Sequence, residues 1–212
     1  MEQFVDIHTH HHPSPDTLSL SNYRLGVDIA MPCAPFSAGI HPWDADKIAD
    51  WESLLDELEK IDCVSIGEIG LDFACSVDRT LQQTLFERQL AIASRRNLPV
   101  IIHNVKATAE VLATLALYPI PAVIFHGFIG SKELLGQIVA RGFYVSFGFG
   151  ALRSPRTIEA LVACPATALL LESDTTGEPI LALYNEVARL RQTTTQQLAT
   201  EIYSNYTKIF NK

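Results

Sequence analysis

The segment VSIGEIGLD, at residues 64–72, begins the part of the chain that decides the fold. Residues 64–69 are a short apolar run of the length of a buried strand. Residues 79–96 follow with apolar side chains at helical spacing, and residues 100–102 form a second short apolar run. A strand, a helix and a strand in this order predict two parallel strands that are joined by a helical crossover.

The same alternation extends from this segment in both directions. Helices are also predicted over residues 46–61, after Ser131, after Ser154 and from Thr195. We therefore expect a single α/β domain over residues 1–212, with a parallel sheet whose strands are buried on both faces. The other short apolar runs that we expect to be strands are 4–7, 36–40, 122–125, 143–147 and 168–171.

A histidine, a glutamate or an aspartate lies at the end of nearly every predicted strand. In an open sheet these residues would lie along a line, whereas in a barrel the carboxyl ends of the strands meet at one mouth. An open dinucleotide-binding sheet would also carry a G-x-G-x-x-G motif after its first strand, and the sequence has none there. We therefore predict a TIM-type (β/α) barrel of about seven to eight strands. The residues concerned are His8, His10, His41, Glu68, His103, His126 and Asp174.

These side chains have the chemistry of metal ligands. Neutral imidazole together with carboxylate suits zinc, manganese or iron and, with enough carboxylate, magnesium. His8 and His10 lie two residues apart on an extended segment, which places both rings on one side. A catalytic zinc uses about three protein ligands, so a larger set can hold two ions that share a bridging carboxylate, with a hydroxide between them. Such a pair activates water, which predicts a hydrolase.

Six segments resemble the motifs of the TatD-like metal-dependent DNase family in order and spacing. The likeness covers nearly the whole chain and includes residues 205–210, which resemble the closing N-x-x-x-x-F helix of that family. The resemblance implies a barrel of the amidohydrolase superfamily and a divalent-metal-dependent hydrolase. The activity it implies is cleavage of phosphodiester bonds in DNA as a deoxyribonuclease, typically from 3′ to 5′ as an exonuclease. The segments are residues 6–10, 38–43, 66–72, 99–103, 125–131 and 171–174.

The resemblance also implies a role for each matching residue. Glu68 would bridge two divalent ions (Mg, Mn or Zn), and Asp174 would bind one of them and also accept the proton of the attacking water. Glu68 and Asp174 are therefore the predicted catalytic residues. The implied ligands are His8, His10 and Asp174 for one ion and His103 and His126 for the other, with Glu68 shared between them.

Three further residues are expected to contact the substrate or to support a ligand. His41 resembles the G-x-H-P histidine of the family, near the substrate, and Asp72 is expected to orient a ligand imidazole. Family members usually carry an arginine two residues after the histidine that matches His103, whereas this chain has Val105 there and Lys106 one position later. A lysine contacts phosphate as a point charge and not through two parallel hydrogen bonds.

The part of the chain after the first strand is shorter than in the family. Residues 13–33 leave no room for the helix, strand and helix that the family has there, and their apolar and polar residues alternate as in a short hairpin or meander. We therefore expect a barrel that is abbreviated near the N-terminus, in a chain of 212 residues against about 250 for a typical barrel. His11 and His12 match no family position and are expected in a solvated loop.

Composition restricts the partners and the compartment. The net charge is −8, so DNA ends or another phosphodiester would be contacted only locally, around the bound ions. The four cysteines form no C-x-x-C pair and no signal peptide precedes Phe4, which favours the reducing cytoplasm. No apolar stretch is long enough to cross a bilayer, and the sequence indicates no particular protein partner.

Two alternatives to a two-metal phosphodiesterase are compatible with these residues. A hydrolase of a small carboxyl ester, amide or lactone would use the same ions and the same barrel, and the net acidity and the missing arginine favour it. A metal-binding interaction subunit without catalysis is the other alternative. The complete set of ligands argues against that subunit, because a chain that has lost catalysis usually loses a ligand first.

Overall fold

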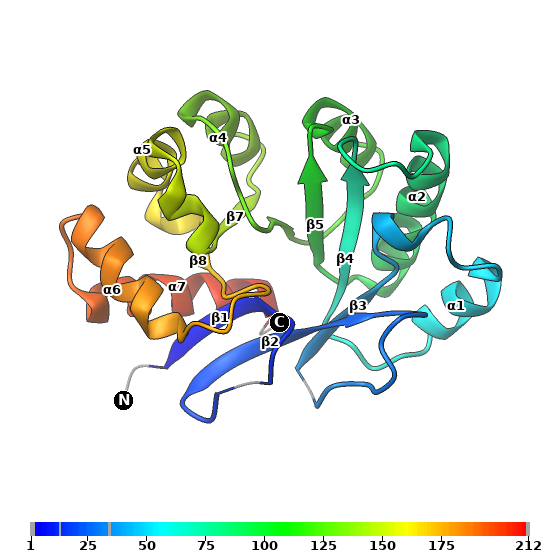
Figure 1. The fold of residues 1–212 in the computed structure, drawn as a ribbon, viewed down its shortest axis with the longest axis horizontal. Coiled ribbons are helices and arrows are strands. Elements are labelled where there is room, and N and C mark those ends of the chain that lie inside the picture. The colour runs from blue at the N-terminus through cyan, green and yellow to red at the C-terminus, as the bar shows by residue number, and fades with distance from the viewer. Residues whose placement is uncertain (1–2, 13, 34, 211–212) are drawn as a thin grey trace. The chain divides into compact units, whose positions relative to one another are not determined.

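The computed structural model describes residues 3–12, 14–33 and 35–210, in which strands and helices follow one another (Figure 1). The strands are β1 (Phe4–Thr9), β2 (Thr17–Arg24), β3 (Phe36–Gly39), β4 (Ser65–Asp72), β5 (Val100–Val105), β6 (Val123–Phe125), β7 (Tyr144–Phe147) and β8 (Leu169–Leu171). The α-helices are α1 (Trp51–Leu58), α2 (Arg79–Arg96), α3 (Thr108–Leu115), α4 (Lys132–Val139), α5 (Pro155–Ala163), α6 (Ile180–Leu190) and α7 (Thr195–Phe210). Short 3-10 helices are η1 (Pro42–Asp44), η2 (Phe149–Arg153) and η3 (Ala166–Ala168).

The strands form one parallel sheet in which their order is their order in the chain, from β1 to β8. Between β4 and β5, for example, Ile66 is paired with Val100 in parallel register. The ends of β1 and β8 are also joined, because Thr9 and Asp174 form a parallel bridge. The first strand therefore neighbours the last one, as the topology of a barrel requires.

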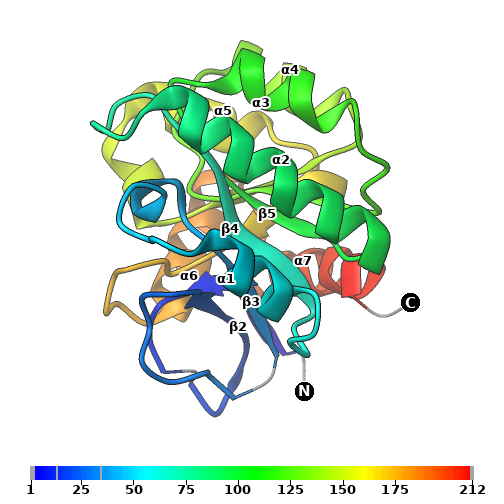
Figure 2. The same ribbon diagram turned by 90° about the vertical axis from the view of Figure 1, so that its right-hand side faces the viewer.

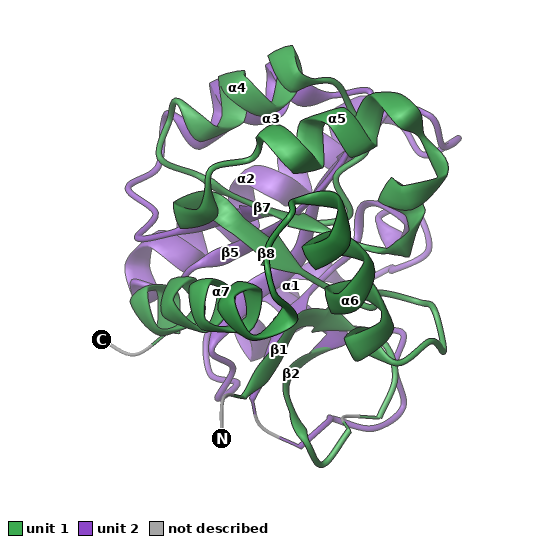
Figure 3. Ribbon diagram, turned by 90° about the vertical axis from the view of Figure 1, so that its left-hand side faces the viewer, with its two compact units in different colours: residues 1–21, 125–212 green, residues 22–124 purple. Residues whose placement is uncertain are grey.

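The chain divides into two compact units (Figure 3). Unit 1 comprises residues 1–21 and 125–212, and so combines β1 with β7 and β8. Unit 2 comprises residues 22–124 and contains β3, β4 and β5. Each unit contains its own group of predicted site residues.

Helix α2 of unit 2 begins and ends where the sequence predicts. The Asp78 carboxylate accepts a hydrogen bond from the Leu81 N–H at the first turn, and Asn97 adopts a left-handed conformation after the last one. The helix packs against β4 (Figure 2), and its buried side chains include Leu85 and Phe86. The apolar stripe of residues 79–96 thus covers one face of the central strand of the unit.

Two buried glutamines of α2 hold strand ends that carry site residues. Gln89 accepts a hydrogen bond from the Ile40 N–H at 2.7 Å and donates one to the Ile40 carbonyl at 3.0 Å. Gln82 accepts from the Asp72 N–H at 2.7 Å and donates to the Asp72 carbonyl at 3.0 Å. These bonds fix the backbone at Asp72 and beside His41, since a buried peptide group must find a partner.

Helices α6 and α7 of unit 1 hold β1 and β8 in a similar way. The Tyr184 hydroxyl on α6 accepts a hydrogen bond from the Val5 N–H at 3.2 Å and donates one to the Val5 carbonyl at 2.9 Å. Asn205 on α7 donates to the carbonyl oxygens of Ala166 and Leu169, at the start of β8. The C-terminal helix therefore supports the strand that leads to Asp174.

Two predicted helix starts that carry a capping side chain are found in the structure. Ser131 caps α4 and Ser154 caps α5, each by accepting a hydrogen bond from a backbone N–H of the first turn. The helix predicted over residues 46–61 is shorter, since α1 begins only after the capping residue Asp50. Helices α3 and α6 were not predicted, and both follow residues without a capping side chain, Ala107 and Pro179.

The predicted hairpin or meander over residues 13–33 is wrong. Residue 13 lies outside the described residues, but β2 is a single strand that pairs with β1 in parallel, with Phe4 opposite Thr17. Alternation of apolar and polar side chains shows that a strand has two different faces, and it does not show the direction of its neighbour. The chain is abbreviated as expected, because the described residues between β1 and β3 form the strand β2 and no helix.

We expect Gly70→Ala to lower the free energy of unfolding by about 3 kcal/mol. Gly70 has a φ of +144°, and a Cβ there would overlap the His103 carbonyl oxygen of the neighbouring strand. Denaturant unfolding measures the loss. Gly136→Ala is the matched control, because Gly136 lies within α4 with nothing within 4 Å of its Cβ position, and alanine favours a helix. Equal stabilities of the two variants would contradict the close approach at Gly70.

Candidate metal centre

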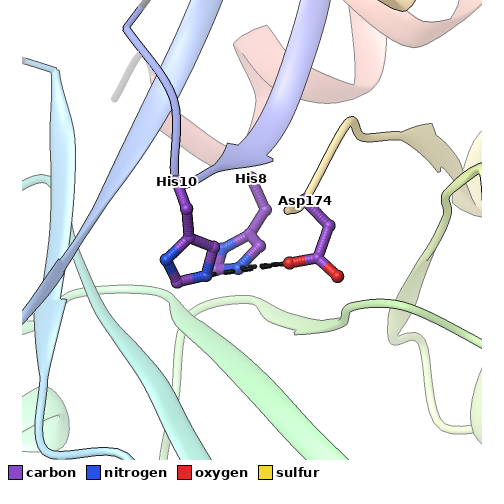
Figure 4. Close-up of side chains that lie close together, drawn as sticks. All are labelled: His8, His10 and Asp174. Atoms are coloured by element: carbon purple, nitrogen blue, oxygen red, sulfur yellow. Dashed lines mark ion pairs between the residues drawn. The ribbon is translucent and has the colours of Figure 1, made fainter. Parts of the chain in front are cut away.

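His8, His10 and Asp174 converge in unit 1 (Figure 4). The Nε2 atoms of His8 and His10 lie 3.8 and 3.7 Å from the same Asp174 oxygen, Oδ1. The backbone sets this arrangement, because the His10 N–H donates to the Asp174 carbonyl and the Asp174 N–H donates to the His8 carbonyl, both at 3.0 Å. We call these three residues the unit 1 cluster. Its donors face one point at separations wider than a hydrogen bond.

His126 and Glu172 lie beside the unit 1 cluster. The ring of His126 is 4.4 Å from that of His8 between centroids, and its Nδ1 is 3.3 Å from Glu172 Oε1. Burial raises the pKa of the Glu172 carboxyl. The charges of His126 and His8 lower it by more, so the net pKa lies below its ordinary value. Glu172, which is completely buried, therefore orients His126 as a carboxylate.

Asp6 supports the segment that carries Asp174. Its two carboxylate oxygens accept hydrogen bonds from the Ser173 N–H at 2.8 Å and from the Ser173 hydroxyl at 2.6 Å. Burial raises the pKa of Asp6 to about 6, although the bonds from Ser173 act in the opposite direction. Sequence reasoning gave Asp6 no role, and the signal available was an acidic residue inside the apolar run 4–7.

His41, Glu68 and His103 converge in unit 2, and we call them the unit 2 cluster. Glu68 Oε1 is 3.1 Å from His41 Nε2 and 2.6 Å from His103 Nδ1. His41 Nδ1 accepts a hydrogen bond from the Trp43 N–H, so the ring hydrogen of His41 is on Nε2 and is donated to Glu68. Burial lowers the pKa of His41, an effect that the bond to Glu68 only partly offsets.

Asp72 contacts the opposite side of the His103 ring. Its Oδ2 is 3.1 Å from His103 Nε2, and its role in orienting that imidazole stays a prediction. The pKa of Asp72 lies below its ordinary value, because hydrogen bonds from Trp43, His103 and Ala74 outweigh the opposing effect of burial. Sequence reasoning placed Asp72 near an imidazole, but it could not identify which one.

The remaining predicted residues have more open surroundings. Lys106 is exposed in a bend between β5 and α3, with a φ of +54°. His11 and His12 are exposed after β1, as expected for a solvated loop, and His11 Nε2 lies 2.9 Å from the Thr175 carbonyl oxygen.

His103 and His126, which were predicted to share an ion, belong to different units, so their pairing and the bridging role of Glu68 stay predictions.

Each cluster offers ligands for a divalent ion, and in the unit 2 cluster these are His103 and Glu68, because His41 Nε2 carries the hydrogen that it donates to Glu68. Two imidazole nitrogens and one carboxylate oxygen meet in each cluster, within 4.8 Å of one another. This is the ligand type of catalytic zinc sites and of related manganese and iron sites. A parallel α/β sheet with such clusters at the ends of its strands defines a class of protein, the metal-dependent hydrolases built on barrels.

Comparison with known proteins identifies the family within this class. Residues 30–211 match the family model described as TatD related DNase. The chain is 32% identical to the metal-dependent hydrolase YabD of Bacillus subtilis, over 81% of this chain and 75% of that protein. It is 33% identical to the 3′-5′ ssDNA/RNA exonuclease TatD of Pantoea ananatis, over 82% and 76% of the two chains. The chain belongs to the TatD-related DNase family and is a metal-dependent hydrolase.

Solved structures confirm the predicted fold class. The TatD homologue YjjV of Escherichia coli superposes with a TM-score of 0.81 at 23% identity, over 99% of this chain and 98% of that one. A TatD family hydrolase of Entamoeba histolytica gives a TM-score of 0.80 at 14% identity, over the same shares of the two chains. The fold is therefore the TIM-type α/β barrel, with eight strands among the described residues. Among the described helices, none is long and apolar enough to cross a membrane.

Proposed function

We propose that this protein removes nucleotides from the 3′ end of single-stranded DNA or RNA by hydrolysis of phosphodiester bonds. The convergence of two imidazoles and a carboxylate on one point in the unit 1 cluster carries the proposal. Support for the substrate comes from the relative in Pantoea ananatis, whose name states a 3′-5′ exonuclease activity on single-stranded DNA and RNA. The site ligands and the number of ions are part of the proposal.

The unit 1 cluster would hold one divalent ion, and His103 and Glu68 of the unit 2 cluster would hold a second, such as Mg²⁺, Mn²⁺ or Zn²⁺. Bound divalent ions supply positive charge that polarises the phosphoryl group and makes water a stronger nucleophile. Asp174 then accepts a proton from the attacking water, because its side chain keeps 35% exposure whereas His8 is fully buried. His41 donates its Nε2 hydrogen to Glu68 and so orients the carboxylate that we predict to bridge the two ions.

The charge of the protein limits how the substrate is bound. With a net charge of −8, a nucleic acid strand gains little from long-range attraction, so contacts are confined to the ions and to single cations such as Lys106. Lys106 is exposed and can reach a phosphate oxygen as a point charge. This arrangement suits one terminal phosphodiester at a time, as an exonuclease requires.

A hydrolase of a small carboxyl ester, amide or lactone is the second candidate function. The observation that favours it is the sequence Asn104-Val105-Lys106, which lacks the arginine that would bind a phosphate through two parallel bonds. The same clusters could polarise a carbonyl group, because a Lewis acid acts on either oxygen.

A substrate panel is expected to separate the two functions. With Mg²⁺ or Mn²⁺, a single-stranded oligonucleotide that is labelled at its 5′ end should yield a ladder shortened from the 3′ end. A phosphorothioate linkage at the 3′ end should block it, and EDTA should abolish it. Nitrophenyl acetate and a simple lactone, assayed with the same preparation, should react at least about a hundredfold more slowly, since an active site stabilises its own transition state best. Turnover of the carbonyl substrates alone would exclude the nuclease.

The compartment and the domain count are also part of the proposal. All four cysteines are free thiols in the structure, which supports the proposal that the protein acts in the reducing cytoplasm. The family model matches residues 30–211 as one stretch, which supports a single functional domain.

A further inference from the structure

Trp43 has a partly exposed ring, but its indole N–H is engaged in a hydrogen bond. The side chain lies on η1, directly after His41 and Pro42, and Trp43 is 43% exposed. Its indole Nε1–H nevertheless donates to Asp72 Oδ2 at 2.7 Å, while its ring meets those of His41 and His103 edge to face, at 4.6 and 5.5 Å between centroids. An exposed tryptophan that serves only packing would not need this short bond to a carboxylate.

Asp72 is held from both of its oxygens. Oδ1 accepts hydrogen bonds from the backbone N–H groups of Ala74 at 2.8 Å and Cys75 at 3.2 Å. Oδ2 accepts the Trp43 indole N–H and lies 3.1 Å from His103 Nε2. The backbone bonds restrain one oxygen, and the indole N–H restrains the other, which is the oxygen that faces the His103 ring.

His103 has a carboxylate on each of its nitrogens. Nδ1 is 2.6 Å from Glu68 Oε1, and Nε2 faces Asp72. A neutral imidazole has one N–H to donate. If Nε2 donates it to Asp72, Nδ1 keeps a lone pair on the side of Glu68 Oε1, where an imidazole nitrogen and a carboxylate oxygen can both bind a cation. If Nδ1 donates it to Glu68 instead, that nitrogen cannot bind a metal.

We propose that Trp43 is a positioning residue that acts through Asp72 to keep the His103 hydrogen on Nε2 and so presents Nδ1 to a divalent ion in the unit 2 cluster. The inference rests on the proposed metal-binding role of His103 and assigns to Trp43 a function that exposure and ring packing do not explain. The 2.7 Å bond and the buried carboxylate that it restrains carry it.

Trp43→Phe tests this inference, because phenylalanine keeps an aromatic ring against His41 and His103 but lacks the N–H. We expect the dissociation constant for Co²⁺ at one of the protein's sites to rise about 10-fold to 100-fold, the usual effect of removing a group that orients a ligand. Equilibrium dialysis of the full chain with Co²⁺ alone measures it. The visible absorption of bound Co²⁺ should change as well, since it reports the geometry of the ligands.

Trp51→Phe is the matched control. Trp51 is the other tryptophan of the chain, lies in the same unit and donates its indole N–H to the Ala45 carbonyl oxygen at 3.0 Å. This variant should bind Co²⁺ as the unmodified protein does. Equal affinities of Trp43→Phe and Trp51→Phe would overturn the inference. An unmodified protein that binds no Co²⁺ would instead refute the proposed function, so the two failures are distinguishable.

Asp72→Asn provides a second test that does not depend on how well the Trp43 variant folds. Asparagine can still accept the backbone bonds of Ala74 and Cys75 through Oδ1, and its amide NH₂ then faces His103 and the Trp43 N–H in place of an accepting oxygen. It should weaken Co²⁺ binding at least as much as Trp43→Phe does. In the double variant the two losses should not add, because both remove one interaction. Additive losses would show that Trp43 does not act through Asp72.

Discussion

Replacement of Asp174 by asparagine is expected to lower the rate of phosphodiester hydrolysis on the order of a thousandfold. Asparagine keeps the size of the side chain and one oxygen ligand, but it removes the negative charge on which His8 and His10 converge and the proton acceptor for water. Loss of several kcal/mol of charge stabilisation corresponds to about this factor, since roughly 1.4 kcal/mol is tenfold. Initial rates on a 3′-terminal oligonucleotide measure the effect, and elemental analysis should show less bound metal.

Asp16→Asn is the control for Asp174→Asn. Asp16 is an exposed aspartate of the same unit, in the turn before β2, so the change of charge is identical without a cluster being altered. This variant should keep the full rate. An Asp174→Asn protein that hydrolyses the oligonucleotide at the unmodified rate would refute the role of Asp174 as ligand and proton acceptor.

Replacement of Glu68 by glutamine should have an effect of similar size for a different reason. Glu68 is buried. Its Oε1 accepts the Nε2 hydrogen of His41 and lies 2.6 Å from His103 Nδ1. The amide would place a neutral group where we predict a carboxylate shared by two ions, and several kcal/mol of charge stabilisation would again be lost, or roughly a thousandfold in rate. The assay is hydrolysis of the oligonucleotide at saturating Mn²⁺.

Stoichiometry separates the bridging role of Glu68 from a purely structural one. A bridging carboxylate should be needed for both ions, so Glu68→Gln should bind less metal at both sites, whereas Asp72→Asn should affect one. Glu110→Gln, an exposed glutamate on α3 of the same unit, should leave both sites and the rate unchanged. Full occupancy and full rate in Glu68→Gln would refute the bridging role.

Most of the fold could be predicted because its signals are local. An apolar stripe predicts the helix over residues 79–96, and Asp78 before it and Asn97 after it mark its ends, all within one segment. Short apolar runs predict strands such as β4 and β5. Where such signals are missing, as at the starts of α3 and α6, the prediction failed.

The predicted site residues could be found for a related reason. Strands of a parallel sheet end at the same edge, so a polar residue at the end of one strand implies neighbours at the ends of the others. His8, His10 and Asp174 meet in unit 1 by this rule, and Glu68 and His103 meet in unit 2. Asp6 could not be found in this way, because its contact with Ser173 is fixed by packing and not by a strand end.

The sequence by itself determined the class of fold, most of its elements and the residue types at the strand ends, because periodicity, capping and strand length depend on neighbours along the chain. Only the tertiary structure decided the direction of β2 and the polar contacts around the clusters. Ser173 meets Asp6 across 167 positions, and Trp43 meets Asp72 across 29. The formation of such a bond depends on the packing of whole elements, which no short segment encodes.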